Sequence, residues 1–182
     1  MPLLPKKLLV VVLLQLVILA SLPLYKSLNV AVGTDVLLEV TPVISHSTAE
    51  GTTVVLVYGG LTQLTSDLIG QKVFVAGEPV FVALRQVGVG WVPSGASSNK
   101  PPQGTTYIRG VVAEGNAVIT ADGTRARLNT NRLVVRYGIE DYVVAEGTVF
   151  PSGMGAMRAQ VALEEGGEGV LKQLFVDDQP WP

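Results

Sequence analysis

Apolar residues follow one another almost without interruption near the start of the chain. The run covers residues 8–24, follows Lys6 and Lys7, and is interrupted only by a glutamine, a serine and a proline. As a helix of about 17 residues rising ~1.5 Å each, it would reach ~25 Å, near the lower limit for crossing the hydrocarbon core of a bilayer. The pattern therefore predicts one N-terminal transmembrane helix.

This segment is either a secretory signal that is removed or a signal-anchor that is retained. The apolar stretch is longer than the roughly 7–15 residues usual in a signal peptide. No small-residue cleavage site follows it, because residues 22–25 read Leu-Pro-Leu-Tyr, so retention is favoured. The two lysines before the run predict a cytoplasmic N-terminus. We expect residues 1–27 to form the signal-anchor and the remainder to lie in a periplasmic, lumenal or extracellular space.

Beyond this segment, apolar residues alternate with polar ones at a period of two, and β-branched residues dominate. Such alternation is typical of half-buried β-strands. The expected strands are residues 36–41, 53–58, 72–76, 80–89, 106–113, 116–120, 124–128, 133–137, 142–145, 159–164 and 170–176. Only residues 62–69, which carry leucines at helical spacing, predict a short helix.

Glycine-bearing turns separate the expected strands. They lie at Gly77-Glu78, Gly115-Asn116, Asp122-Gly123 and residues 165–169, and each tolerates the positive φ angles of a tight hairpin. Strands joined by such short turns pair antiparallel. Residues 93–104 contain three prolines and predict an exposed loop.

The pattern predicts a single all-β domain over residues 28–182, built as an antiparallel barrel or a sandwich. About 155 residues suffice for a hydrophobic core of useful size. All 15 acidic residues follow residue 28 and three of the 13 basic residues precede it, which leaves ten basic against 15 acidic side chains and a net charge of −5.

This charge argues against a nucleic acid partner, which requires clustered basic residues. The nearest such set is Arg125, Arg127, Arg132 and Arg136, and acidic side chains flank it. The chain also contains no cysteine, which excludes disulfides, thiolate metal sites and thiol nucleophiles.

Two segments of the domain carry unusual motifs. The first is residues 51–58, Gly-Thr-Thr-Val-Val-Leu-Val-Tyr, preceded by Thr-Pro-Val at residues 41–43. The second is residues 136–142, Arg-Tyr-Gly-Ile-Glu-Asp-Tyr, followed by Ala-Glu-Gly at residues 145–147. Together with the N-terminal segment, they resemble the GDYXXLXY family of bacterial membrane-anchored proteins, named for a Gly-Asp-Tyr-x-x-Leu-x-Tyr motif.

The second motif matches the family more fully than the first. Thr52 and Thr53 stand where the family has Asp and Tyr, and residues 44–47, Ile-Ser-His-Ser, replace a charged lead-in, Asp-Pro-Arg-Asp. The matching positions, which we expect to be partner-binding or structural, are Gly51, Leu56, Tyr58, Arg136, Tyr137, Gly138, Glu140, Tyr142, Glu146 and Gly147. Family members often occur beside multi-pass membrane proteins, so the resemblance implies an anchor, this fold and a membrane-protein partner, and no particular reaction.

The charged residues of the second motif predict an ion pair. A guanidinium can hold a carboxylate through two parallel hydrogen bonds, so we expect Arg136 to pair with Glu140 or Glu146 and to lock one hairpin to its neighbours. Gly138 would let the chain reverse between them. A binding surface for a partner is the alternative interpretation of these residues.

Candidate catalytic chemistry is sparse. His46 is the single histidine and lies between two serines, but neighbours in an extended segment point to opposite faces, so we expect an exposed turn histidine. One histidine without cysteines cannot supply a conventional zinc site. A Ser-Lys hydrolase needs a buried lysine of lowered pKa, whereas the strand pattern turns Lys72 and Lys172 outward and Lys100 lies in the polar loop.

The sequence therefore predicts a membrane-anchored accessory or assembly protein that acts through contacts with a membrane-protein partner, without catalysis, metal or cofactor of its own. An extracytoplasmic ligand-binding module is the alternative, and it would show a concave, partly apolar site with a few converging polar groups. A hydrolase would instead show a nucleophile and a base within hydrogen-bond reach.

Overall fold

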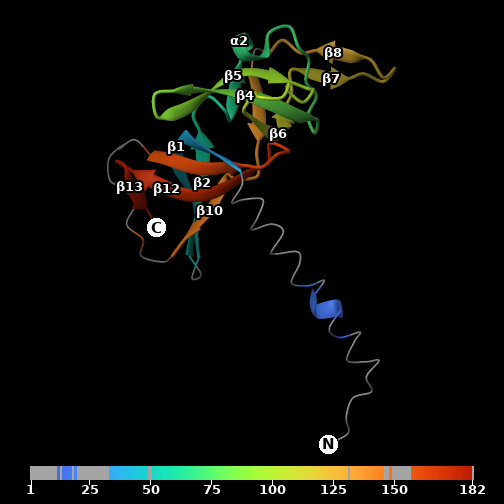
Figure 1. Cartoon of the computed structure of the whole chain (residues 1–182). Helices are drawn as coiled ribbons and strands as arrows, with labels where there is room; N and C mark the ends of the chain where they lie inside the picture. The colour runs from blue at the N-terminus through green and yellow to red at the C-terminus, as the bar shows by residue number, and fades with distance from the viewer. Residues whose placement is uncertain are drawn as a thin grey trace, which may run out of the picture.

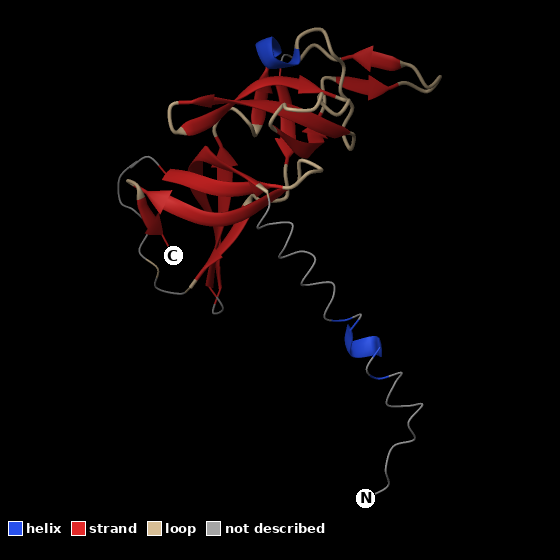
Figure 2. Ribbon diagram, in the orientation of Figure 1, coloured by secondary structure: helices blue, strands red, loops and turns tan. Residues whose placement is uncertain are grey.

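The computed structural model describes residues 12, 14–17, 19, 33–48, 51–130, 132–145, 148 and 157–181, with only the main chain described for residues 44–48 and 51. Within these ranges the domain consists of paired strands and one short helix (Figures 1 and 2). The named strands pair antiparallel throughout. The predicted all-β, antiparallel class is confirmed.

The first sheet has six strands in the order β10-β2-β1-β11-β12-β13. These are β1 (Thr34–Thr48), β2 (Gly51–Tyr58), β10 (Asp141–Val144), β11 (Met157–Leu163), β12 (Gly169–Val176) and β13 (Gln179–Trp181). Alternate residues face the core, as Val36 and Leu38 of β1 and Val54 and Leu56 of β2 are almost fully buried. This is the expected period of two for a sheet with one buried face.

The second sheet has five strands in the order β3-β9-β6-β4-β5. These are β3 (Gln63–Thr65), β4 (Pro79–Val87), β5 (Gly90–Ser97), β6 (Tyr107–Glu114) and β9 (Arg132–Arg136), with helix α2 (Ser66–Ile69) directly after β3. A separate hairpin of β7 (Ala117–Ile119) and β8 (Arg125–Arg127) projects from this part of the molecule (Figure 1).

One hydrophobic core unites the two sheets. A continuous cluster of buried side chains includes Leu38 and Leu56 from the first sheet and Val80 and Leu133 from the second. Both sheets curve, so that the fold combines a half-barrel with a near-barrel (Figure 2). The two sheets share this core, and the chain segments that connect them lie where the sheets meet.

Two predicted elements have a different structure. Residues 72–76, expected as a strand, contribute only a single bridge between Val75 and Ala117, because a side chain rather than a strand accepts the N–H of Phe74. The expected loop at residues 93–104 begins instead as β5. A β-bulge lies beside Pro93, and β5 is an edge strand, so a residue without an N–H is tolerated there.

The expected helix over residues 62–69 is also shorter than predicted. Its first half pairs with β9 as β3, and only α2 is helical. At the C-terminal end, β13 was not expected from the pattern. It pairs with β12 and buries Trp181, whose exposed fraction is 8%.

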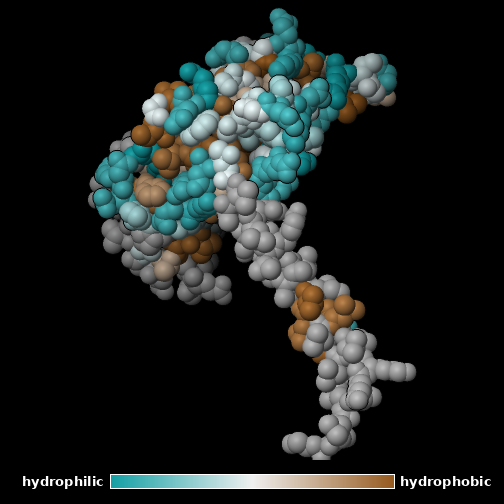
Figure 3. Space-filling model, in the orientation of Figure 1, coloured by the Kyte–Doolittle hydropathy of each residue, from teal (hydrophilic) through white to brown (hydrophobic). Residues whose placement is uncertain are grey.

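The N-terminal apolar segment is described in part. Residues 12, 14–17 and 19 are helical, and their exposed apolar side chains form the brown group on the segment that extends away from the domain in Figure 3. No helix in the described part of the chain is long and apolar enough to cross a membrane. The other residues of the run lie outside the described ones, so the transmembrane helix stays a prediction.

Candidate functional site

The two sequence motifs lie side by side in the fold. β2 carries the first motif and pairs with β10, where Asp141 of the second motif lies opposite Val55. Each motif also adjoins a connection between the sheets. Residues 59–62, here called the outgoing crossing, lead from β2 to β3, and residues 137–140, the returning crossing, lead from β9 to β10.

Two buried tyrosines fasten these crossings to each other. Tyr58 ends β2 and donates its hydroxyl hydrogen to the carbonyl of Ile139 on the returning crossing, at 2.8 Å. Tyr137 begins the returning crossing and donates to the carbonyl of Leu61 on the outgoing crossing, at 3.0 Å. Each tyrosine thus satisfies a main-chain acceptor that burial would otherwise leave without a partner. We call this pair the tyrosine clasp.

Burial also raises the pH at which the clasp would ionise. The pKa values of Tyr58 and Tyr137 are both raised above the ordinary 10.0, first because burial disfavours the charged phenolate and second because the carboxylate of Glu140 is close. Both hydroxyls, which are neutral at physiological pH as in any tyrosine, therefore stay protonated hydrogen-bond donors to a higher pH than a free tyrosine.

Glu140 folds back onto the turn that starts the returning crossing. Its Oε1 accepts the N–H of Tyr137 at 2.5 Å and its Oε2 accepts the N–H of Gly138 at 2.8 Å. Gly138 has a φ of 80°, a left-handed conformation that glycine adopts without steric penalty. The glycine and the glutamate of the motif therefore build one turn.

This turn overturns the predicted ion pair between Arg136 and Glu140. The carboxylate oxygens are engaged by main-chain N–H groups, and Arg136 is exposed and belongs to none of the salt bridges among the described residues. The proposed pairing with Glu146 is not described, because Glu146 and Gly147 lie outside the described residues.

Three further motif residues are also used within the fold. Leu56 is fully buried, and its N–H donates to the carbonyl of Glu140 at 2.7 Å. The ring of Tyr142 packs against that of Trp181 with centroids 6.1 Å apart. Gly51 begins β2 opposite Thr48 of β1.

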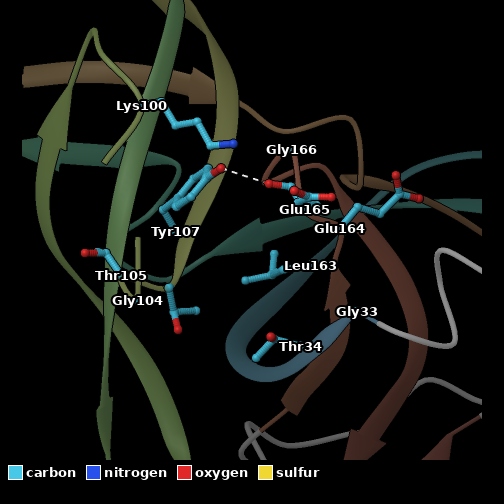
Figure 4. Close-up of a pocket in the computed structure, with 11 residues that line it drawn as sticks. Gly33, Thr34, Lys100, Gly104, Thr105, Tyr107, Leu163, Glu164, Glu165 and Gly166 are labelled. Carbon is cyan, nitrogen blue, oxygen red and sulfur yellow. Dashed lines mark hydrogen bonds between the residues drawn. The ribbon is translucent and has the colours of Figure 1, made fainter. Parts of the chain in front are cut away.

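A cleft lies elsewhere, between the start of β1 and the segment before β6 (Figure 4). Its volume is about 940 Å³. Lys100 and Tyr107 lie on one side, and Glu164 and Glu165 on the other. The hydroxyl of Tyr107 donates across it to the carbonyl of Glu165 at 3.0 Å. The cleft combines a cation, carboxylates, hydroxyls and the apolar Leu163, which is the mixed lining expected of a ligand pocket.

The candidate catalytic residues are dispersed. His46 lies within β1, next to a β-bulge, rather than in a turn. Lys72 donates to a main-chain carbonyl, that of Ala96. Lys172 pairs with Asp35 at 2.7 Å. In the described part of the chain, no group of three or more His, Cys, Asp or Glu side chains could hold a metal ion.

Asn116 is a structural residue that the sequence did not reveal. It was expected in a hairpin turn after Gly115, but β6 and β7 do not pair with each other. Its side chain is buried, with its Oδ1 accepting the N–H of Phe74 at 2.7 Å and its Nδ2 donating to the carbonyl of Lys72 at 3.0 Å. A buried asparagine that ties two distant segments has no local sequence signal, because Gly-Asn is also typical of turns.

The comparisons with known proteins identify the family of the chain. No curated protein and no solved structure matches the chain. The family model described as GDYXXLXY protein matches residues 15–174, a range that contains the tyrosine clasp, the cleft and both crossings. The chain therefore belongs to the GDYXXLXY family.

Proposed function

We propose that this chain is a membrane-anchored accessory or assembly protein that acts through contacts with a membrane-protein partner and has no catalytic activity of its own. Its domain lies outside the cytoplasm, with residues 1–27 as the anchor. The observation that carries the proposal is the inward use of the family motifs. The hydroxyls of Tyr58 and Tyr137 and the carboxylate of Glu140 bind main-chain atoms where the two sheets join.

The argument rests on where the polar groups point. A catalytic motif leaves a nucleophile, a base or an oxyanion donor facing a space that a substrate can enter. Here the hydroxyls of Tyr58 and Tyr137 and both oxygens of Glu140 are engaged by the two crossings. These three residues maintain the shape of the domain, which supports a role in binding rather than in a reaction.

The mass of the complex extracted from its native membrane tests this proposal. The full chain is extracted with a mild detergent and its protein mass is measured by light scattering. We expect a complex heavier than the 19.2 kDa chain that contains a second membrane polypeptide. A lone chain would contradict the proposal.

The anchor and topology need a separate measurement. Protease added to intact spheroplasts should remove the domain and leave the N-terminal residues on the membrane. A mature N-terminus between residues 20 and 30 would contradict retention of the anchor, and a domain protected from protease would contradict its location.

Binding of a small ligand is a second candidate function, favoured by the cleft of about 940 Å³. Thr105 lines this cleft and Ser98 does not. Native mass spectrometry of the purified protein should reveal a bound molecule that is lost in Thr105→Trp and kept in Ser98→Trp. Equal retention in both variants, or no bound molecule, would dismiss the cleft as its site.

A further inference from the structure

The hairpin of β7 and β8, with its flanking residues 115–128, is here called the arm. Of its strand residues, only Ala117 belongs to the buried set, so the arm adds little to the core. A two-stranded hairpin is marginally stable by itself in water. Its attachments to the rest of the domain must therefore hold it in place.

The base of the arm is fixed by close packing. A Cβ at Gly115 would lie 2.3 Å from the carbonyl oxygen of Phe74, so only glycine allows this approach. The buried Asn116 then joins the arm to the main chain of Phe74 and Lys72. The N–H of Ala117 adds a bond to the carbonyl of Phe74 at 3.1 Å.

Two arginines hold the arm further along. Arg125 forms a two-pronged pair with Glu78, at 2.6 and 3.3 Å. Arg127 donates to the carbonyl of Gly70 at 3.3 Å. Because these attachments come from β8, they fix one face of the arm toward the domain.

The tip of the arm is ordered by its own side chains. The carboxylate of Asp122 accepts from the hydroxyls of Thr120 and Thr124 and from the N–H of Thr124. These hydrogen bonds lower the pKa of Asp122 to about 2. The arm is thus preorganised from base to tip, which reduces the entropy lost when another chain binds it.

One face of the arm carries three apolar side chains. Val118 lies opposite Ala126 in the hairpin, and Leu128 follows Ala126 on the same face, since side chains alternate along a strand. Val118 is 44% exposed and Leu128 is 41% exposed. The other face carries Ala117, Arg125 and Arg127, which contact the domain, and Ile119, which lies opposite Arg125 and is 61% exposed.

The outer edge of β8 presents unpaired main-chain groups. The bonds from Thr120 N to Thr124 O and from Leu128 N to Asn116 O define the hydrogen-bonded pairs of the hairpin. Pairs alternate in an antiparallel ladder, so the N–H and C=O groups of Arg125 and Arg127 point away from β7. No described strand pairs with that edge.

We propose that an extended segment of the membrane partner adds to the outer edge of β8 as a third strand. Its alternate apolar side chains cover Val118, Ala126 and Leu128, and a carboxylate on its other face meets Arg127, which belongs to no salt bridge among the described residues. Main-chain hydrogen bonds then provide the affinity, and the apolar side chains of Val118, Ala126 and Leu128 determine the register of the added strand. This inference rests on the proposed function, because it assigns the binding mode of the partner.

The absence of native cysteines permits a clean cross-linking test in native membranes. Leu128→Cys is labelled with a benzophenone maleimide and irradiated, with Val89→Cys as the control, since Val89 is 67% exposed between β4 and β5. We expect a protein adduct with a different polypeptide from position 128 and little from position 89.

Two substitutions at Arg127 then distinguish the contribution of its main-chain N–H to partner binding from that of its side chain. Arg127→Pro removes the outward N–H, whereas Arg127→Ala removes only the guanidinium. We expect the adduct to fall by roughly tenfold or more with proline, equivalent to at least ~1.4 kcal/mol, and by less with alanine. Protection of the Phe74 amide from hydrogen exchange checks that the arm is still attached.

A variant that leaves the edge intact tests the apolar face. Val118→Asp should reduce the adduct comparably, and Val87→Asp, on the exposed side of β4, should not. Failure of this reduction would overturn the proposal even if Arg127→Pro unfolds the arm.

Three further results would overturn the strand-addition proposal. They are equal adducts from positions 128 and 89, equal effects of proline and alanine at position 127, and an adduct made of two copies of this chain. If the extracted protein still forms a larger complex with a second polypeptide, the proposed function stands and only the arm is dismissed. If it does not, both are dismissed.

Discussion

Each hydroxyl of the tyrosine clasp holds a buried main-chain carbonyl on the opposite crossing. Phenylalanine at position 58 or 137 would keep the ring and leave that carbonyl without a donor. We expect Tyr58→Phe and Tyr137→Phe each to lower the free energy of unfolding by ~1–3 kcal/mol. Denaturant unfolding measures it, with Tyr107→Phe as the control because its hydroxyl bond is exposed. Losses no larger than that of Tyr107→Phe would refute the clasp.

Alkaline pH should act on the same two residues. Their folded pKa values are raised, so above pH 10 the unfolded chain loses protons that the folded chain keeps. Stability is therefore fully present below pH 10 and falls as the pH rises further. Phenolate absorbance should show that two of the five tyrosines ionise only when the protein unfolds. In Tyr58→Phe or Tyr137→Phe, only one tyrosine should behave in this way. Ionisation of all five in the folded protein would contradict burial of the clasp.

Arg136 and Glu140 should differ sharply on substitution. Glu140→Gln replaces one acceptor oxygen by an N–H₂ group that faces a main-chain donor, and we expect a loss of about 1.5–3 kcal/mol. Arg136→Ala removes an exposed side chain and should change stability by less than ~0.5 kcal/mol. Thermal melting of both variants decides between this turn and the ion pair. A larger loss for Arg136→Ala would restore the ion pair.

At the residue scale, the sequence predicted the turn at Gly138 but assigned the wrong partner to the carboxylate of Glu140. The positive φ of Gly138 follows from glycine itself. The choice of Glu140 between a guanidinium and two main-chain donors depends on the fold, because the donors face the carboxylate only once the returning crossing is formed.

At the scale of elements, alternation located most strands of both sheets. It failed where a strand depends on its neighbours. β3 is three residues long and exists because β9 lies beside it, and β5 contains a proline that only an edge position and a bulge allow. Residues 72–76 alternate like a strand, but Asn116 takes the main-chain bonds that a neighbouring strand would have made.

Asn116 should therefore be the most sensitive residue of the arm. Asn116→Ala leaves the N–H of Phe74 and the carbonyl of Lys72 without their partners, and we expect a loss of roughly 2–4 kcal/mol. Asn99→Ala, at an exposed position, should change stability by less than ~0.5 kcal/mol. Chemical denaturation compares them. Equal stability of the two variants would show that the base of the arm is not held by this side chain.

At the scale of the whole molecule, the two motifs act as one joint, although residues 59–139 lie between Tyr58 and Glu140 and include the whole second sheet. The sequence identified the residues of this joint and the all-β class. It left a barrel and a two-sheet sandwich open, because strand alternation does not say which strands share a sheet. The cleft was not predicted either, since it forms between segments distant in the sequence.

Our central proposal is that Tyr58, Tyr137 and Glu140 maintain the shape of the domain and take no part in a reaction. It is tested by measuring, for full chains with Tyr58→Phe, Tyr137→Phe or Glu140→Gln, both the folded fraction and the fraction found in the membrane assembly after mild extraction. We predict that the assembled fraction follows the folded fraction in every variant. A variant that is folded as fully as the parent but absent from the assembly would contradict the account, because its motif residue would then act directly on a partner or a ligand.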